Sequence, residues 1–95
     1  MPLITFTNPA ILAWLEAKGI KGEHKNHVNA NDVLHRHVYG RLPLWLAAYA
    51  ERISEISLPK LTREGRDRFN EGLLSVPEMD AAGAYIATYT VRNAG

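Results

Sequence analysis

One segment of the chain, residues 42–57, carries a helical repeat of apolar side chains that constrains the fold more than any other feature. At about 100° per residue its large apolar side chains fall within one arc, and Glu51, Ser54 and Glu55 fall opposite. Pro59 follows and ends the pattern. We therefore predict a helix over residues 42–57 that forms the core of the protein. The side chains in the apolar arc are Leu42, Trp45, Leu46, Tyr49, Ile53 and Ile56.

The N-terminal part of the chain also carries residues that are typical of the start and the end of a helix. Asn8 can accept a hydrogen bond from a backbone amide as an N-cap, and Pro9 needs no donor at the first helical position. Gly19 is a natural C-terminal stop. These residues predict a helix over 9–18.

Two later segments indicate further helices. Thr62 begins a polar-faced helical pattern that extends over residues 62–74. Ser75 and Glu78 have the spacing of a capping box, which predicts a last helix starting near residue 76.

Both ends of the chain carry β-prone residues. Residues 3–7 and 85–91 could pair as a small two-stranded sheet, although whether residues 84–92 form a helix or a strand stays open. The predicted fold class is mostly α, a compact small domain of about four helices. An α+β fold with a short two-stranded pairing of the N- and C-terminal segments is the alternative. Because 95 residues can enclose one core and little more, we predict a single globular domain over 1–95.

Composition excludes several classes of function. The net charge of +1 argues against the strongly basic footprint of a general nucleic-acid binder. The absence of cysteine excludes disulfides and thiol chemistry. No apolar run approaches the roughly 18 residues that a membrane span needs, and the N-terminus lacks the pattern of a signal peptide. We expect a cytoplasmic protein with no membrane partner.

All four histidines lie in one polar stretch, at His24, His27, His35 and His37. Residues 20–31 have little to bury and predict a loop. After the loop, Asn29 or Asn31 could cap a short helix running to Tyr39, whereas the same residues also alternate acceptably as a strand.

The local structure decides whether the four histidines could bind zinc. On a strand, His35 and His37 would lie on one face and could hold one ion, with His24 and His27 as further ligands. On a helix, the rings of His35 and His37 would differ by about 200° around the axis and could not share a metal. The cap signals favour the helix, so we predict no cofactor and keep a His-rich zinc site as an alternative.

Catalytic signatures are absent or weak. A histidine pair such as His27 and His37 could act as general acid and base, but the chain has no Gly-x-Ser-x-Gly, Gly-rich phosphate-binding or His-Glu-x-x-His motif. We predict no catalytic residue and no enzymatic activity.

The segment 18–41 is mildly positive and could contact a partner. Arginine and histidine are frequent interface residues, so Lys25, Arg36, His37 and Arg41 are predicted to form a contact surface. The same segment could instead bind DNA or RNA.

The helix over 62–74 is a second candidate for nucleic-acid binding. Three arginines lie along it, but acidic residues that would repel phosphate groups lie between them. The arginines are Arg63, Arg66 and Arg68, and the acidic residues are Glu64, Asp67 and Glu71.

By elimination, the sequence favours a small non-enzymatic protein-binding module. An inhibitor, an antitoxin, an adaptor or a phage or host-interaction factor would occupy a surface of a larger protein or complex in this way. DNA or RNA binding and metal binding are the alternatives, and homo-oligomerisation stays open.

Overall fold

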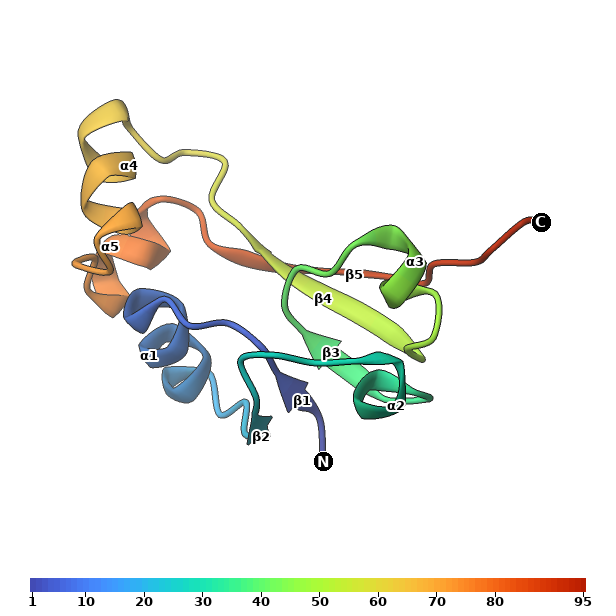
Figure 1. The fold of residues 1–95 in the computed structure, drawn as a ribbon. Coiled ribbons are helices and arrows are strands. Elements are labelled where there is room, and N and C mark those ends of the chain that lie inside the picture. Colours follow the sequence, from blue (N-terminus) through green and yellow to red (C-terminus); the bar gives the residue numbers. More distant parts are fainter. The chain divides into compact units, whose positions relative to one another are not determined.

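A computed structural model describes all residues 1–95 and shows a mixed five-stranded sheet, with helices in the segments that connect its strands along the chain (Figure 1). Helices account for 33% of the chain and strands for 19%. The fold is therefore α/β, and the prediction of a mostly α domain of about four helices is wrong. In chain order the elements are β1 (Leu3–Ile4), α1 (Pro9–Ala17), β2 (Glu23–His24), α2 (Ala30–Val33), β3 (His37–Tyr39), α3 (Leu44–Ala47), β4 (Arg52–Ser57), α4 (Arg63–Asn70), α5 (Val76–Ala81) and β5 (Tyr85–Tyr89).

Contacts divide the chain into two compact units. The first, which we call the sheet unit, comprises residues 1–6, 22–55 and 87–95. The second, the helical unit, comprises residues 7–21 and 56–86. Two of the boundaries fall within β4 and β5. That residues 1–95 behave as a single domain stays a prediction.

The strands are ordered β2-β1-β3-β4-β5. β1 pairs in parallel with β2 and with β3, and β3 pairs in parallel with β4. Because the sheet is mixed, β5 is the antiparallel strand, at one edge. The predicted pairing of the two ends of the chain is wrong, since β3 and β4 lie between β1 and β5. Residues 85–89 are nevertheless a strand, as their β-prone composition indicated.

One face of the sheet unit carries its apolar core. Leu3 is in register with Val38, and Val38 is in register with Ile53, so their side chains share a face. Residues of α2 and α3, and the turn after α3, cover this face and are buried with it: Val33, Leu46, Ala47 and Ala50. Burial of this face is the main apolar stabilisation of the sheet unit.

The long helix predicted over residues 42–57 does not form. α3 ends at Ala47, and residues 52–57 form the strand β4. Parallel neighbours such as β3 and β4 need a crossover connection, and residues 40–51 supply it around the single turn of α3. Ile53 then gains a place in the sheet beside Val38. Tertiary pairing has overridden a local helical pattern.

The segment after the loop resolves into a short helix and a strand. Asn29 caps α2 and accepts a hydrogen bond from the Asp32 backbone amide at 3.0 Å. The helix stops at Val33, because Leu34 is extended and His35 has a positive φ of 58°. The predicted helix to Tyr39 is thus too long, and His37–Tyr39 form β3.

The helical unit follows its local sequence signals more closely. Asn8 caps α1, with Pro9 in its first turn, and the helix ends one residue before the predicted bound. Thr62 caps α4, which ends at Asn70 and is shorter than the predicted 62–74. Ser75 and Glu78 form the predicted capping box of α5. No helix in the structure has the length and apolar character needed to cross a membrane.

Two side-chain contacts fix the helices of the helical unit. α1 packs against α5, and the Trp14 indole donates to the Asp80 carboxylate at 2.9 Å. The Asn8 amide donates to the Phe69 carbonyl at 2.8 Å, which ties the start of α1 to the end of α4. The unit therefore has both an apolar contact and directional polar contacts between its helices.

Candidate functional site

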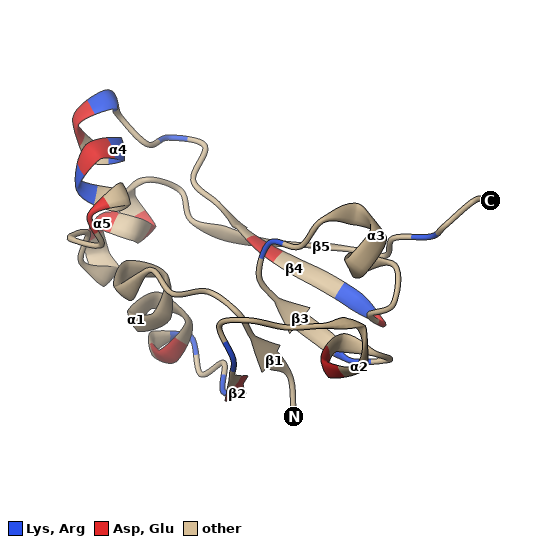
Figure 2. Cartoon of the chain, viewed as in Figure 1, with Lys and Arg blue, Asp and Glu red and all other residues tan.

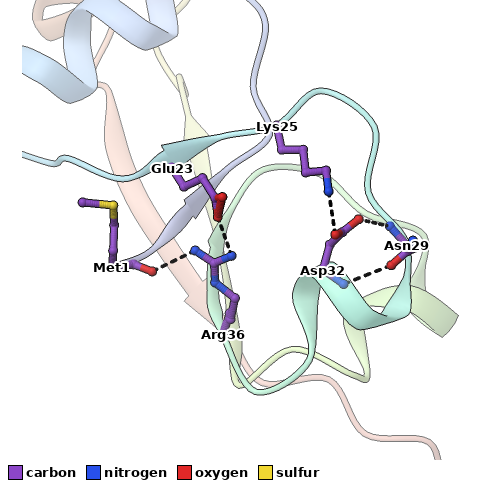
Figure 3. A network of polar contacts seen from close by, with 6 residues as sticks. All are labelled: Met1, Glu23, Lys25, Asn29, Asp32 and Arg36. Carbon is purple, nitrogen blue, oxygen red and sulfur yellow. Dashed lines mark hydrogen bonds and ion pairs between the residues drawn. The ribbon is translucent and has the colours of Figure 1, made fainter.

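Two of the four residues predicted to contact a partner form ion pairs within the sheet unit (Figure 3). Arg36 donates to the Glu23 carboxylate at 2.7 Å and to the Met1 carbonyl at 3.0 Å. Lys25 donates to Asp32 at 2.7 Å. These bonds link β2 to the start of β3 and to α2, so both cations have a structural role in the unbound protein.

Asp32 lies at the centre of the second group in Figure 3. Besides its pair with Lys25, its carboxylate accepts from the Asn29 backbone amide at 2.8 Å. The Lys25 ammonium and the Asn29 amide lower the pKa of Asp32. Asp32 therefore stays ionised and holds the loop before α2 in place.

The third predicted contact residue, His37, lies in a chain of polar side chains that crosses three strands. Its Nε2 lies 2.6 Å from the Ser54 hydroxyl, and that hydroxyl lies 2.7 Å from the hydroxyl of Thr88. The His37 ring also stacks on Tyr39, with centroids 4.5 Å apart. Partial burial, and secondarily the charge of Arg52, lower the pKa of His37. His37 is therefore neutral at neutral pH.

A histidine bonded to a serine resembles part of a nucleophilic pair, but Ser54 is fully buried. Its hydroxyl is bonded on both sides and has no open approach for a substrate. The His37–Ser54–Thr88 chain satisfies polar groups inside the sheet. Ser54 was predicted to lie on a solvated helix face. Its contact with His37 depends on the strand register, which the local sequence does not indicate.

Arg41 is the one predicted contact residue that points freely into solvent. Its side chain is 84% exposed, and it reaches Glu55 only at 3.9 Å. It follows directly after Gly40, which packs against Thr5 at the carboxyl end of β1. Arg41 thus lies beyond the carboxyl ends of two adjacent parallel strands.

The four histidines do not converge. His24 lies on β2, His27 in the following loop, His35 in the turn after α2 and His37 on β3. No group of three or more His, Asp or Glu side chains is placed to hold a metal ion. The zinc alternative therefore gains no geometric support.

The arginines of α4 alternate with acidic residues along an exposed helix, and Figure 2 shows this mixture of charges. Arg68 pairs with Glu78, and this pairing lowers the pKa of Glu78 to about 2. α4 has no buried residue. Its surface offers a mixed field to a nucleic acid and no concentrated positive patch.

A group of exposed apolar side chains surrounds α3 in the sheet unit. Leu44, Trp45 and Tyr49 are 75%, 66% and 48% exposed, and we call these three residues the α3 surface. Trp45 and Tyr49 were predicted to lie on the apolar face of a long core helix. The structure exposes them because the helix ends after one turn and only Leu46 and Ala47 face the sheet.

A groove of about 400 Å³ runs between α3 and the end of the chain in the sheet unit. Its floor and walls are largely aliphatic, and Arg92 lies in its lining without an ion pair. A second, smaller hollow of about 260 Å³ lies between Trp45 and Tyr49. The residues lining the groove are Leu42, Leu44, Ala47, Ile53, Glu55, Tyr89, Thr90, Val91 and Arg92.

No protein-family model, curated protein or solved structure matches this chain.

Proposed function

We propose that the protein is a non-enzymatic binding module that docks another protein on the α3 surface and the adjoining groove. The observation that carries the proposal is the exposure of Leu44, Trp45 and Tyr49 in one region. Exposed apolar groups gathered beside a groove are typical of interaction sites, whereas monomeric proteins usually scatter them singly. Tryptophan and tyrosine are also the residues that contribute most to binding energy at interfaces.

The chemistry of the groove indicates what the partner presents. An aliphatic side chain would fill the space lined by Leu42, Ile53 and Val91. The guanidinium of Arg92 has no ion pair, so an acidic residue beside that aliphatic side chain would gain a partner. We therefore assign the partner an exposed segment that combines a large apolar residue with a carboxylate.

The proposed contact surface differs from the one predicted from the sequence, although both lie in the sheet unit. Lys25 and Arg36 are engaged in ion pairs, and His37 is engaged with Ser54. Of the predicted contact residues, Arg41 remains available, and it pairs weakly with Glu55 of the groove lining. The role stays that of an inhibitor, antitoxin, adaptor or host-interaction factor in the cytoplasm, acting by covering a surface of a larger protein.

Peptide selection tests the proposal. The wild-type protein is immobilised and used to select from a random peptide library displayed on phage. We expect enriched peptides with a large apolar residue next to Asp or Glu. Their binding should fall at least tenfold in Trp45→Ala and in Arg92→Glu. Leu73→Ala, which alters an exposed leucine of the helical unit, is the control and should bind normally. A selection without consensus, or equal binding by all variants, would contradict the proposal.

A second candidate function, binding of nucleic-acid phosphates, rests on the strand order. After β1, the chain passes through α1 and adds β2 on one side of β1. The next strand, β3, is added on the opposite side of β1, so the direction in which strands are added reverses there. Sheets with such a change of direction bind ligands beyond the carboxyl ends of the strands at that point. Arg41 lies there, exposed and weakly paired.

This candidate predicts a measurable salt dependence. Binding of a fluorescent single-stranded RNA should weaken steeply between low and physiological salt. Arg41→Ala should reduce both the affinity and the slope, whereas Arg63→Ala on α4 should change neither. A flat salt response would rule out this role.

A further inference from the structure

The strand β5 leaves one edge of the sheet open. It is the last strand in the order β2-β1-β3-β4-β5, and no strand pairs with its outer side. The opposite edge is β2, which is only two residues long. Natural proteins usually protect a long edge with charged residues, proline or a bulge. Residues 85–91 contain no charged residue and no proline.

Hydrogen bonds elsewhere in the sheet show which backbone groups of β5 face outwards. The Gly40 amide donates to the Ser54 carbonyl at 3.0 Å, so the backbone groups of Ser54 point towards β3. The hydroxyls of Ser54 and Thr88 are 2.7 Å apart, and the Lys60 amide donates to the Ala82 carbonyl at 2.9 Å. Both contacts fit one antiparallel register, in which Ser54 lies opposite Thr88 on β4 and β5. In an antiparallel pair, opposite residues either bond to each other through both backbone groups or not at all.

Ser54 and Thr88 are therefore a non-hydrogen-bonded pair. The amide and carbonyl of Thr88 then point away from β4, and so do those of Ile86, two residues earlier. No backbone hydrogen bond outside the sheet involves residues 85–92. The free edge thus offers two residues with unpartnered donors and acceptors.

The residues of β5 are arranged nearly symmetrically about Ala87. They read Tyr-Ile-Ala-Thr-Tyr, with an aromatic residue at each end and a β-branched residue on each side of the centre. Tyr85 and Tyr89 are 51% and 54% exposed, and they lie on the same side of the strand because they are four positions apart. A strand with this symmetry is complementary to an antiparallel copy of itself.

We propose that β5 pairs with β5 of a second copy of this chain, antiparallel and across a two-fold axis at Ala87. In this register Ile86 of each copy lies opposite Thr88 of the other, and the outward backbone groups bond to each other. Tyr85 lies opposite Tyr89 of the second copy as a non-hydrogen-bonded pair, in which side chains approach most closely. The two sheets become one continuous sheet. This inference rests on the strand order and the residues of β5 and not on the proposed function, although Tyr89 also lines the groove.

Sedimentation velocity of the full-length protein at rising concentration tests the pairing. We expect the mass to shift from the 10.6 kDa of one chain to twice that value in the micromolar range. A protein that remains monomeric at about 100 μM, a concentration at which weak strand pairing is populated, overturns the proposal.

Two matched double variants test the register. Both Tyr85→Lys/Tyr89→Lys and Tyr85→Lys/Tyr89→Glu remove the same aromatic rings from exposed positions. The first places lysine opposite lysine in the dimer, and the second places lysine opposite glutamate. We expect the dimer dissociation constant of the Lys/Lys variant to exceed that of the Lys/Glu variant by roughly tenfold or more. Equal constants overturn this register.

A cross-link gives an independent measurement that does not require altered tyrosines. Opposite residues of a non-hydrogen-bonded pair have Cα atoms about 4.5 Å apart, a distance that a disulfide can span. The chain has no cysteine, so Ala87→Cys can form only an intermolecular disulfide. We expect rapid cross-linking of Ala87→Cys under mild oxidation and slow cross-linking of the exposed control Leu73→Cys. Equal rates for the two variants overturn the two-fold axis at Ala87.

Discussion

Polar side chains join the elements of both units, but the two units differ in how many large apolar side chains they expose. In the helical unit, polar side chains join the helices: Trp14 bonds to Asp80, and Arg68 pairs with Glu78. In the sheet unit, the helix α3 leaves Leu44 and Trp45 exposed. Of the eight large apolar residues exposed in the structure, only Leu73 and Tyr85 belong to the helical unit. The sheet unit therefore carries six of these eight exposed residues.

The largest expected effect tests whether the two units unfold together. Ile53 is buried in the sheet unit, and Met79 is fully buried in the helical unit. Replacing either by alanine should lower the free energy of unfolding by about 2–5 kcal/mol, because it removes buried apolar surface and leaves a cavity. One tryptophan reports on each unit, Trp45 on the sheet unit and Trp14 on the helical unit.

Single-tryptophan versions, made with Trp14→Phe or Trp45→Phe, separate the two signals in urea unfolding. If residues 1–95 are a single domain, each alanine variant shifts both fluorescence transitions by the same amount. A shift confined to the unit that carries the substitution would show that the units unfold independently.

The next effect is steric and lies in the sheet unit. A Cβ atom added at Gly40 would lie 1.8 Å from the Thr5 hydroxyl, so β1 and β3 could not keep their spacing. Gly40→Ala should destabilise the protein by about 1–3 kcal/mol. Adding Thr5→Ala removes the clashing oxygen and should restore part of that loss in the same urea experiment. An additive effect of the two substitutions would contradict this contact.

The difference between the units also explains what the sequence could predict. The caps at Asn8, Thr62 and Ser75 act over three residues or fewer, and each is found where it was predicted. In the sheet unit the pairing partners are distant in sequence, as for Val38 and Ile53. The apolar residues over 42–57 do recur with helical spacing, but Ile53 and Ile56 lie in the strand β4 instead of in a helix.

The same reasoning applies to the candidate site. Exposure of Trp45 follows from the early end of α3, which no local signal marks. The four histidines are close in sequence but lie on different elements, so their density did not indicate a shared site. Lys25 and Arg36 were predicted to contact a partner, whereas their carboxylate partners within the protein depend on how the strands are paired.

A smaller effect on the sheet unit depends on pH. Partial burial lowers the pKa of His37 below its ordinary value of 6.5, so the unfolded chain takes up this proton more readily than the folded protein. Stability should therefore decrease as the pH falls below about 6.5. His37→Gln should flatten this part of the profile. A pH titration followed by NMR that gives His37 a pKa above 6.5 would contradict this explanation.

The smallest effect belongs to the helical unit and appears at lower pH. Arg68 and the Ser75 backbone amide lower the pKa of Glu78 from 4.5 to about 2. The ionised carboxylate therefore stabilises the folded state fully above about pH 4.5, and this contribution is lost as the pH falls towards 2. Arg68→Gln should raise the pKa of Glu78 towards its ordinary value, as measured by carboxyl NMR. Because the pair is exposed, added salt should weaken the effect. Acid would thus weaken the sheet unit first, through His37, and the helical unit only in the range where Glu78 takes up its proton. An unchanged Glu78 pKa in Arg68→Gln would instead assign the shift to the cap of α5.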